Sequence, residues 1–439
     1  MSQASRTSRR GFLKTGAAAG AFSTLGLSRT LAVLGSPNGL LQVGVIGVGG
    51  RGAANLAGVA HENVVALCDV DANTLAAART GFPKAAGYAD FRKLLDRNDL
   101  DAIVVSTPDH THAVAAMAAL KSGRHAYCEK PLTHSVAEAR ALTEVARETG
   151  LVTQMGTQIH AGANYRRVVE LIRGGAIGEV NQAHAWVGKS WGGGERPTEV
   201  PPVPATLDWD LWLGPAPARP YHPTYHPANW RRWWDFGGGT LADMGCHYLD
   251  LVFWALGLSH CTKVEASGSP PHPETAPTKL RVRWQFPARR QAKTPMPECQ
   301  VVWHDGGLRP KLFADGKLPD WGDGVLFLGS DGMLLADYGR YQLLPLPDAK
   351  KVPAAPATPL PQIPESIGHH NEWTEACKGV GTPLCNFGYS GPLTESVLLG
   401  TVAYRLQKPL VWKWRTMETP GVPEAQALVR PEFRAGWSL

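Results

Sequence analysis

QVGVIGVGGRG, residues 42–52, decides the fold that we expect for this chain. The apolar run at residues 43–48 is short enough for one buried strand, and residues 53–60 are typical of a helix. Between them, Gly47, Gly49 and Gly52 have the spacing G-x-G-x-x-G. In a dinucleotide-binding fold the first glycine permits a tight turn, the second lets the backbone approach a pyrophosphate, and the third lets the helix pack on the strand.

The phosphate groups would lie at the start of the helix that follows this loop. A helix N-terminus offers free N–H groups and a partial positive charge, and both favour anions. We therefore expect Gly50 and Arg51 to join the three glycines in binding the cofactor.

An acidic residue ends the next predicted strand, NVVALCDV at residues 63–70. Asp69 lies about 20 positions beyond the glycines, where a carboxylate binds the ribose 2′-hydroxyl. A carboxylate there would repel a 2′-phosphate, so the sequence predicts NAD and makes NADP the less favoured cofactor. The alternative is a turn or capping Asp in an ordinary α/β domain.

The pattern of strands and helices predicts an α/β protein of two domains. Strands alternate with helices through residues 40–156, which predicts an NAD-binding Rossmann domain with a doubly wound parallel sheet. From residue 157 to 439 we expect an α+β domain with a mostly antiparallel open sheet. There, strands follow one another without intervening helices at residues 263–267, 280–286, 299–304, 325–328 and 333–337.

Composition describes an ordinary globular protein. The chain has 439 residues, a formal net charge of +6 and no stripe of Lys and Arg, so nothing indicates a nucleic-acid partner. The seven cysteines form no C-x-x-C pair, and we expect buried thiols rather than disulfides.

The N-terminus resembles an export signal. SRRGFLK at residues 8–14 is a twin-arginine pattern, and a weakly apolar run follows at residues 17–27. We therefore predict a Tat signal peptide over residues 1–34, recognition by the Tat export machinery and a periplasmic location. The alternatives are an uncleaved signal that anchors the protein to the membrane and a disordered basic tail of a cytoplasmic enzyme.

Two strand ends in the first domain carry polar residues. STPDHTH, residues 106–112, follows one strand, and we expect Ser106, Thr107, Pro108 and His112 to lie in a loop beside the cofactor. Neighbouring ligands at metal-site spacing are missing, so we expect no metal there. Glu129 and Lys130 follow the next strand, where a lysine could donate or accept a proton.

A third stretch, GGGTLADMGCHYLD at residues 237–250, is predicted to begin a helix. Asp243 and His247 are four residues apart and would share one helix face, where they could position a hydroxyl and move its proton. Asp250 would point elsewhere or form a structural pair. The alternative for the first two is a helix-terminal Asp and a satisfied core His.

With these motifs in order, the chain resembles the glucose–fructose oxidoreductase / inositol dehydrogenase / rhizopine-catabolism (Gfo/Idh/MocA) family. The resemblance rests on VGVIGVGGRG, CDVD, STPDHTH, CEKP and GGGTLADMGCHYLD. It implies that Lys130, Asp243 and His247 are catalytic: Lys130 or His247 would take a hydroxyl proton, and Asp243 would orient His247. It also implies that Glu129 and Lys130 contact the cofactor, and that the C-terminal sheet forms a homodimer or homotetramer.

Substrate contacts are less clearly indicated. Gln158 and His160 lie where members of this family bind substrate, but the match is loose. Residues 188–239 are rich in tryptophan, including Trp234, and aromatic faces suit a carbohydrate pocket. The alternative is that these indoles pack the loop onto the domain.

We therefore predict an exported, NAD-dependent oxidoreductase acting on a hydroxyl of a sugar, sugar derivative or cyclic polyol, with tightly bound cofactor. Soluble NADH would not be recycled outside the cytoplasm. A redox-neutral glycosidase or lyase, which oxidises its substrate only transiently, is the first alternative. A sugar-binding protein without catalytic activity is an alternative of another class.

Overall fold

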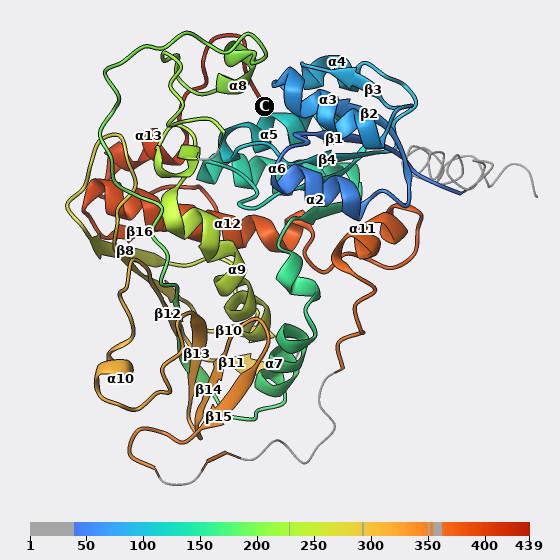
Figure 1. Cartoon of the computed structure of the whole chain (residues 1–439). Helices are drawn as coiled ribbons and strands as arrows, with labels where there is room; N and C mark the ends of the chain where they lie inside the picture. Colours follow the sequence, from blue (N-terminus) through green and yellow to red (C-terminus); the bar gives the residue numbers. More distant parts are fainter. Residues whose placement is uncertain (1–38, 228, 292–293, 350–351, 354–361) are drawn as a thin grey trace, which may run out of the picture.

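The computed structural model describes residues 39–227, 229–291, 294–349, 352–353 and 362–439 (Figure 1). The twin-arginine segment lies outside these ranges. Within them, no helix combines the length and the apolar character needed to cross a bilayer.

The first sheet has six parallel strands in the order β3-β2-β1-β4-β5-β6, which confirms the predicted doubly wound topology. The central strands are nearly all apolar because both faces of the sheet are covered. Their bounds are β1 Gln42–Ile46, β2 Asn63–Cys68, β3 Ala86–Tyr88, β4 Ala102–Val105, β5 His125–Cys128 and β6 Thr153–Met155.

Helices cover both faces of this sheet. The connecting helices are α2 Arg51–Gly58, α3 Ala72–Gly81, α4 Phe91–Leu95, α5 Asp109–Lys121 and α6 Val136–Thr149. Helices α5 and α6 share one apolar core with Ile46 and Val105. Leu56 of α2 belongs to a second core with Val43 and Val45.

The second sheet has eight strands in the order β15-β14-β13-β7-β12-β9-β8-β16. All neighbours in it are antiparallel except β7 and β12, so the predicted mostly antiparallel sheet is confirmed. The bounds are β7 Val180–Trp186, β8 Lys263–Gly268, β9 Leu280–Phe286, β12 Cys299–His304, β13 Gly324–Gly329, β14 Met333–Ala336, β15 Tyr341–Leu344 and β16 Leu410–Val411. Strands β10 Arg289–Gln291 and β11 Thr294–Met296 form a separate hairpin.

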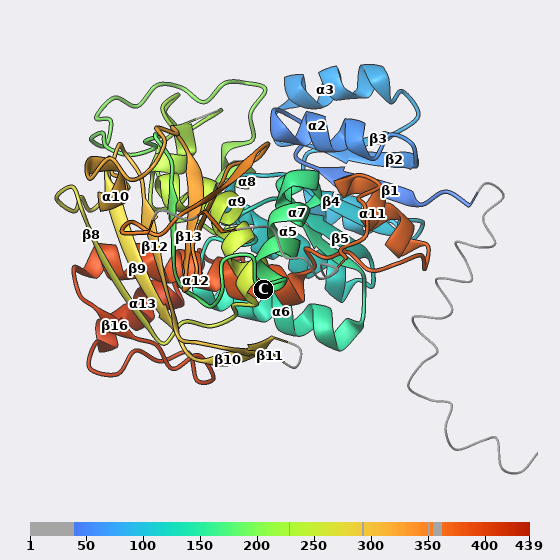
Figure 2. The same cartoon turned by 90° about the horizontal axis from the view of Figure 1, so that it is seen from below.

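The long helix α9, Gly239–Leu256, packs against this sheet beside α7, Ala163–Arg173 (Figures 1 and 2). Every residue of α9 except His247 is buried. The buried helix therefore holds the residues at its N-terminal end in fixed positions.

The last helices return to the first domain. Trp373 and Cys377 of α11, His369–Cys377, complete the core that contains β1 and α2. Helix α12, Phe387–Leu406, packs along α6, and Glu395 forms an ion pair with Arg140 at 2.7 Å. In space, the first domain therefore includes residues from the end of the chain.

One predicted loop is part of a helix. The sequence suggested that the helix begins near residue 113 and that residues 109–112 belong to a loop, but α5 begins at Asp109. Pro108 stands at its N-cap in extended conformation, and an acidic residue occupies the first turn, where the helix dipole favours it. His112 is therefore held on a helix rather than in a loop.

Candidate active site

A cavity of about 850 Å³ lies between the carboxyl ends of the first sheet and the N-terminal half of α9. The Gly-rich loop, Asp69 and the STPD segment line one end of it. Lys130, Asp243 and His247 line the other end. The carboxyl edge of a doubly wound sheet is where such folds bind ligands.

The Gly-rich loop forms a cradle that side chains would close. Gly47 has φ 79°, and a Cβ there would lie 2.8 Å from the Ser106 carbonyl. A Cβ on Gly52 would lie 2.0 Å from the carbonyl oxygen of Gly47, so this glycine lets α2 pack on the turn and does not itself line the cavity. Gly49, Gly50 and Arg51 do line it, at the N-terminus of α2. This backbone fits a pyrophosphate.

Asp69 is fixed at the end of β2. Its two carboxylate oxygens accept hydrogen bonds from the backbone N–H groups of Val48 and Asp71, each at 3.0 Å. The same carboxyl group lines the cavity beside the Gly-rich loop. Because each oxygen retains a second lone pair, Asp69 can still accept hydrogen bonds from ribose hydroxyls.

Lys130 and Asp243 form the closest polar contact at the other end. The Lys130 ammonium donates to the Asp243 carboxylate at 2.5 Å and to its backbone carbonyl at 2.9 Å. The same carboxylate oxygen accepts from Arg231 Nε at 3.0 Å. Asp243 therefore holds Lys130, and no hydrogen bond joins it to His247 among the described residues, so the expectation that it orients His247 stays a prediction.

The charges of these groups are set by their neighbours. Burial alone would lower the pKa of Lys130, but Asp243 and Glu129 raise it above its ordinary value. Burial opposes ionisation of Asp243, but Lys130 and Arg231 prevail and hold its pKa well below the usual range. Burial, with the charge of Lys130, lowers the pKa of His247 to about 3. Near neutral pH, Lys130 is therefore protonated and His247 is neutral.

His247 has one ring nitrogen without a partner in the part of the chain that the structure describes. Its Nδ1 is buried and has no hydrogen-bond partner among the described residues. The imidazole lines the cavity one helical turn beyond Asp243. A neutral imidazole beside an ammonium provides one proton acceptor and one proton donor at the same place.

Glu129 braces the strand end that carries Lys130. It accepts hydrogen bonds from the side-chain amides of Asn55, at 3.0 Å, and Gln158, at 2.8 Å. Gln158, which we expected to bind substrate, lines the cavity, but its side-chain amide donates to Glu129. Asn55 also donates to Ser106 Oγ at 2.9 Å, so one buried amide ties two strand ends together.

The residues predicted to lie beside the cofactor, after the strand β4, are found in the cavity lining. Ser106, Thr107, Pro108 and His112 line it. The two ring nitrogens of His112 lie 2.7 Å from the carbonyl oxygens of Thr107 and Pro131, so the ring braces the two segments.

Two expected substrate ligands lie elsewhere. His160 is 1% exposed, contacts Asp250 at 2.9 Å and stacks on Trp254 at 3.8 Å, so it is a core residue. Asp250 thus forms the structural pair that the sequence suggested as one option. Trp234 lines a separate small cavity, and its indole nitrogen donates to the His272 carbonyl. Neither side chain lines the active-site cavity.

Residues 204–227, here named the strap, cross from the second domain to the end of β2 (Figure 1). The Ala72 N–H donates to the Thr206 carbonyl at 2.8 Å, and the Asp208 N–H donates to the Val70 carbonyl at 2.9 Å. Helix α8, Trp209–Leu213, lies within the strap, and Trp212 and Leu211 line the cavity. The strap therefore encloses the cofactor end.

The tryptophans of this region have mixed roles. All four of Trp209, Trp212, Trp230 and Trp233 pack in one apolar cluster, and two of them, Trp212 and Trp230, also line the cavity. The chain end adds another indole, because Trp437 lines the cavity and lies under the guanidinium of Arg92 at 4.8 Å. The packing that the sequence left as an alternative is thus present, and sugar binding by these indoles stays a prediction.

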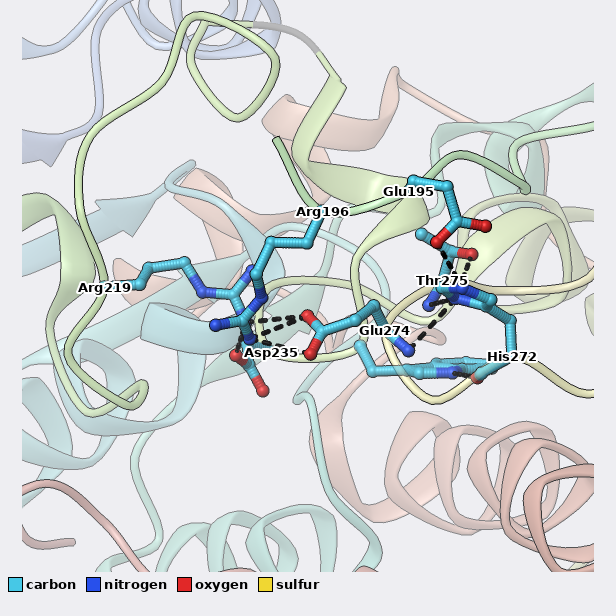
Figure 3. Close-up of polar contacts among 8 residues, drawn as sticks. Glu195, Arg196, Arg219, Asp235, His272, Glu274 and Thr275 are labelled. Carbon is cyan, nitrogen blue, oxygen red and sulfur yellow. Dashed lines mark hydrogen bonds and ion pairs between the residues drawn. The ribbon is translucent and has the colours of Figure 1, made fainter. Parts of the chain in front are cut away.

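Ion pairs fasten the base of the strap to the second domain (Figure 3). Glu274 accepts from Arg196 at 2.7 Å and from Arg219 at 3.2 Å, and Arg219 also pairs with Asp235. Beside them, His272 contacts Glu195 at 3.1 Å and Thr275 at 3.0 Å. These contacts fix the segment that leads into η2, Asn229–Arg232, and so place Arg231 in the cavity.

Sequence reasoning missed several residues of the site. Arg231 and Lys189 line the cavity but lie in a loop with no motif. Asn55 is fully buried, and its polar side chain on the inner face of α2 was a signal that could have been used. Asp109 lines the cavity near Arg231, and burial raises its pKa to about 8.

Two family models match this chain. Residues 41–157 match the oxidoreductase family with an NAD-binding Rossmann fold, and residues 172–290 match the C-terminal α/β domain of the same oxidoreductase family. Together the matches span more than half of the chain and agree with the two sheets. The chain belongs to the Gfo/Idh/MocA oxidoreductase family.

Curated relatives match only part of this family member. A "Glycosyl hydrolase family 109 protein" of Solibacter usitatus is 32% identical over 199 residues, which is 41% of this chain and 45% of that protein. An "Alpha-N-acetylgalactosaminidase" of Shewanella oneidensis is 32% identical over 158 residues, or 33% of this chain and 34% of that one. The chain thus spans less than half the length of these relatives.

Solved structures resemble nearly the whole chain in fold. The WlbA dehydrogenase of Bordetella pertussis, in complex with NADH and UDP-GlcNAcA, superposes with a TM-score of 0.59 at 17% identity, over 84% of this chain and 98% of that one. An aldose-aldose oxidoreductase of Caulobacter crescentus gives 0.55 at 17% identity, over 85% and 99%. At such identities the likeness shows the fold alone.

Proposed function

We propose that this protein is an NAD-dependent oxidoreductase that oxidises a hydroxyl group of a sugar, sugar derivative or cyclic polyol. The observation that carries the proposal is the state of Lys130. An ammonium has three donors, and Asp243 takes two of them, at 2.5 and 2.9 Å. One N–H thus remains for a substrate oxygen, beside the neutral His247 that lines the same cavity.

Bound NAD⁺ would supply the hydride acceptor, and Gly49, Gly50, Arg51 and Asp69 would hold it. Lys130 donates a hydrogen bond to the substrate hydroxyl oxygen and stabilises the negative charge that develops there. His247 accepts the hydroxyl proton. Burial and the charge of Lys130 lower the pKa of His247 to about 3, so the ring is neutral before the reaction and has a free acceptor.

The strap supports a cofactor that stays bound through many turnovers. Leu211 and Trp212 enclose the cofactor end from one side, and Trp437 lines it as well. The backbone hydrogen bonds from Ala72 to Thr206 and from Asp208 to Val70 must break before this end can open. Asp69, free to accept from ribose hydroxyls, favours NAD over NADP.

The relatives named as glycosyl hydrolases favour a second candidate function. In it, the hydroxyl is oxidised only transiently, the glycosidic bond breaks by elimination, water adds, and no net oxidation results. This function also needs a retained cofactor. It uses Lys130 and His247 in the same roles.

Denaturing the washed native protein and assaying the supernatant for nicotinamide cofactor tests the shared part of both candidates. We expect near-stoichiometric NAD(H). A protein that is empty and also fails to bind added NAD⁺ would refute both. Product analysis on glycosides then separates them, because release of the aglycone without net redox change excludes the simple dehydrogenase.

A retained cofactor would suit a protein exported folded by the Tat machinery, as SRRGFLK suggests. We propose a periplasmic location and a homodimer or homotetramer formed through the C-terminal sheet. Cell fractionation, with the N-terminal sequence of the mature protein, tests the first. Light scattering tests the second, and a monomer at working concentration would contradict it.

A further inference from the structure

Positive charge gathers at the reactive end of the cavity. Lys130, Lys189 and Arg231 line it, from the end of β5, the segment after β7, and η2. Burial lowers the pKa of His247, and the charges of Lys130 and Lys189 lower it further, which places both ammonium groups near the imidazole. Three segments that are far apart in the sequence thus bring cations to one place.

Negative charge does not balance them. Asp243 is ionised and pairs with two of these cations, Lys130 at 2.5 Å and Arg231 at 3.0 Å. Burial raises the pKa of Asp109 to about 8, which keeps it largely protonated near neutral pH. Glu129 accepts hydrogen bonds from the amides of Asn55 and Gln158, and its pKa is raised by burial while the charge of Lys130, and then that of Arg51, lowers it. Lys189 is therefore the cation of this end with which no described carboxylate forms an ion pair.

Two of the cations have unused hydrogen-bonding capacity. The Lys189 ammonium lies 3.8 Å from the Met244 sulfur, and no described carboxylate oxygen forms an ion pair with it. Arg231 uses Nε for Asp243 and lies 4.2 Å above the Trp230 ring, while its terminal nitrogens donate to no described residue.

Two arginines elsewhere in the same loop donate to carboxylates from their terminal nitrogens, which Arg231 does not. Arg196 and Arg219 are both paired with Glu274, and Arg219 also with Asp235 (Figure 3). Cations left without counter-charge in a cavity repel one another, and an anionic ligand relieves that repulsion. The fork of an arginine suits two oxygens of a carboxylate or phosphate.

We propose that the substrate is an anionic sugar whose carboxylate or phosphate oxygens are bound by Lys189 and Arg231. This inference rests on the proposed function, because it concerns the substrate of the same site. Lys189, which is exposed and lines the cavity, provides one charge, and Arg231 provides a second beside Asp243. The hydroxyl to be oxidised then lies at Lys130 and His247.

The test measures sugar-dependent reduction of the bound cofactor with matched sets of sugars. Each set contains a neutral methyl glycoside, the corresponding uronate and the corresponding 6-phosphate, in the gluco, galacto and manno series. We expect kcat/KM for an anionic member to exceed that for its neutral counterpart by about ten- to a hundredfold. The uronate and phosphate arms identify which anion the site takes.

Variants of Lys189 connect the preference to this residue. Lys189→Gln should reduce the ratio of anionic to neutral kcat/KM by about tenfold, mainly through KM, and Lys189→Arg should retain most of it. Lys84→Gln is the matched control, because Lys84 is exposed and lies outside the cavity.

The outcomes separate the two proposals. Turnover of neutral sugars that equals or exceeds that of the anionic ones overturns the anionic substrate and leaves the proposed oxidoreductase intact. A preference for anions that Lys189→Gln does not change also overturns it. If no sugar in any series reduces the bound cofactor, the proposed function fails, and this inference fails with it.

Discussion

The two ends of the active-site cavity are built in different ways. The cofactor end is made from consecutive backbone, residues 42–52, together with the Asp that ends the next strand. The reactive end is made from side chains of Lys130, Lys189, Arg231, Asp243 and His247, carried by four separate segments. The first end depends on the backbone conformation of the chain. The second depends on charged groups that shift one another's pKa values.

Lys130→Met should have the largest effect on the reactive end. It removes the ammonium that contacts Asp243 and is proposed to donate to the substrate hydroxyl, so we expect turnover to fall by about a thousandfold. Because Met cannot bond the carboxylate, Asp243 retains only Arg231. Cofactor content and circular dichroism should stay close to wild type.

Lys84→Met provides the control for a lost surface lysine. Unchanged turnover in Lys130→Met would remove the proposed mechanism and favour a protein that only binds sugar.

The cofactor end should instead be disrupted by a substitution that crowds the backbone. A Cβ on Gly52 would lie 2.0 Å from the Gly47 carbonyl oxygen, whereas one on Gly50 would meet nothing within 4 Å. We expect Gly52→Ala to lose at least about 3 kcal/mol of unfolding free energy and most cofactor binding. Gly50→Ala, at φ 51°, should lose only about 1 kcal/mol.

Urea unfolding with cofactor analysis measures both variants. Equal losses would contradict the view that Gly52 serves helix packing and Gly50 does not.

The strap connects the two ends and can be weakened from the chain terminus. Trp437→Ala removes an indole that lines the cavity and packs near Phe91 and under Arg92. We expect the dissociation rate of the cofactor to rise about tenfold, because an aromatic contact contributes about 1 kcal/mol or more. The chemical step, which occurs at the other end, should change little.

Exchange of bound cofactor against labelled NAD⁺ measures this rate. Trp191→Ala is the matched control, because Trp191 is 41% exposed and does not line the cavity. Equal exchange rates in wild type and Trp437→Ala would show that the chain end does not retain the cofactor.

The last prediction concerns the boundary between the two ends, at Asp109. Its folded-state pKa is raised by burial to about 8, above its ordinary value, so the folded protein binds more protons than the unfolded chain between these values. Stability should therefore decrease as the pH rises from about 5 to about 8, by at most about 1.4 kcal/mol per pH unit. Asp109→Asn should flatten this slope.

Unfolding midpoints in urea across this pH range, with cofactor removed, test it. A slope that is the same in both proteins would mean that Asp109 is ionised in the folded state.

The contrast between the ends also explains what the sequence could reveal. Gly47, Gly49 and Asp69 lie in one strand–turn–helix–strand unit, so spacing alone was enough to place them. Lys130, Asp243 and His247 were found through motifs, but their contacts were not. Whether Asp243 bonds His247 or Lys130 depends on how two domains meet, and helix spacing does not contain that information.

Residues without a motif were missed for the same reason. Arg231 reaches the cavity because ion pairs at Glu274 fix the preceding loop, and those pairs join positions far apart in sequence. His160 was misplaced because its neighbours in sequence resemble a substrate loop, while its partners, Asp250 and Trp254, come from α9. The first sheet was predictable because short, regular helical crossovers connect its parallel strands.

The return of α11 to the first sheet affects how the chain can fold as it is synthesised. Trp373 and Cys377 cover an apolar surface of β1 and α2, which are made about three hundred residues earlier. Until the ribosome has passed α11, the nascent Rossmann domain keeps that surface exposed and needs protection from aggregation. Completion of the cofactor-binding domain is thus one of the last events of synthesis. A fragment ending at residue 157 would expose this apolar surface and aggregate rather than fold as an independent domain.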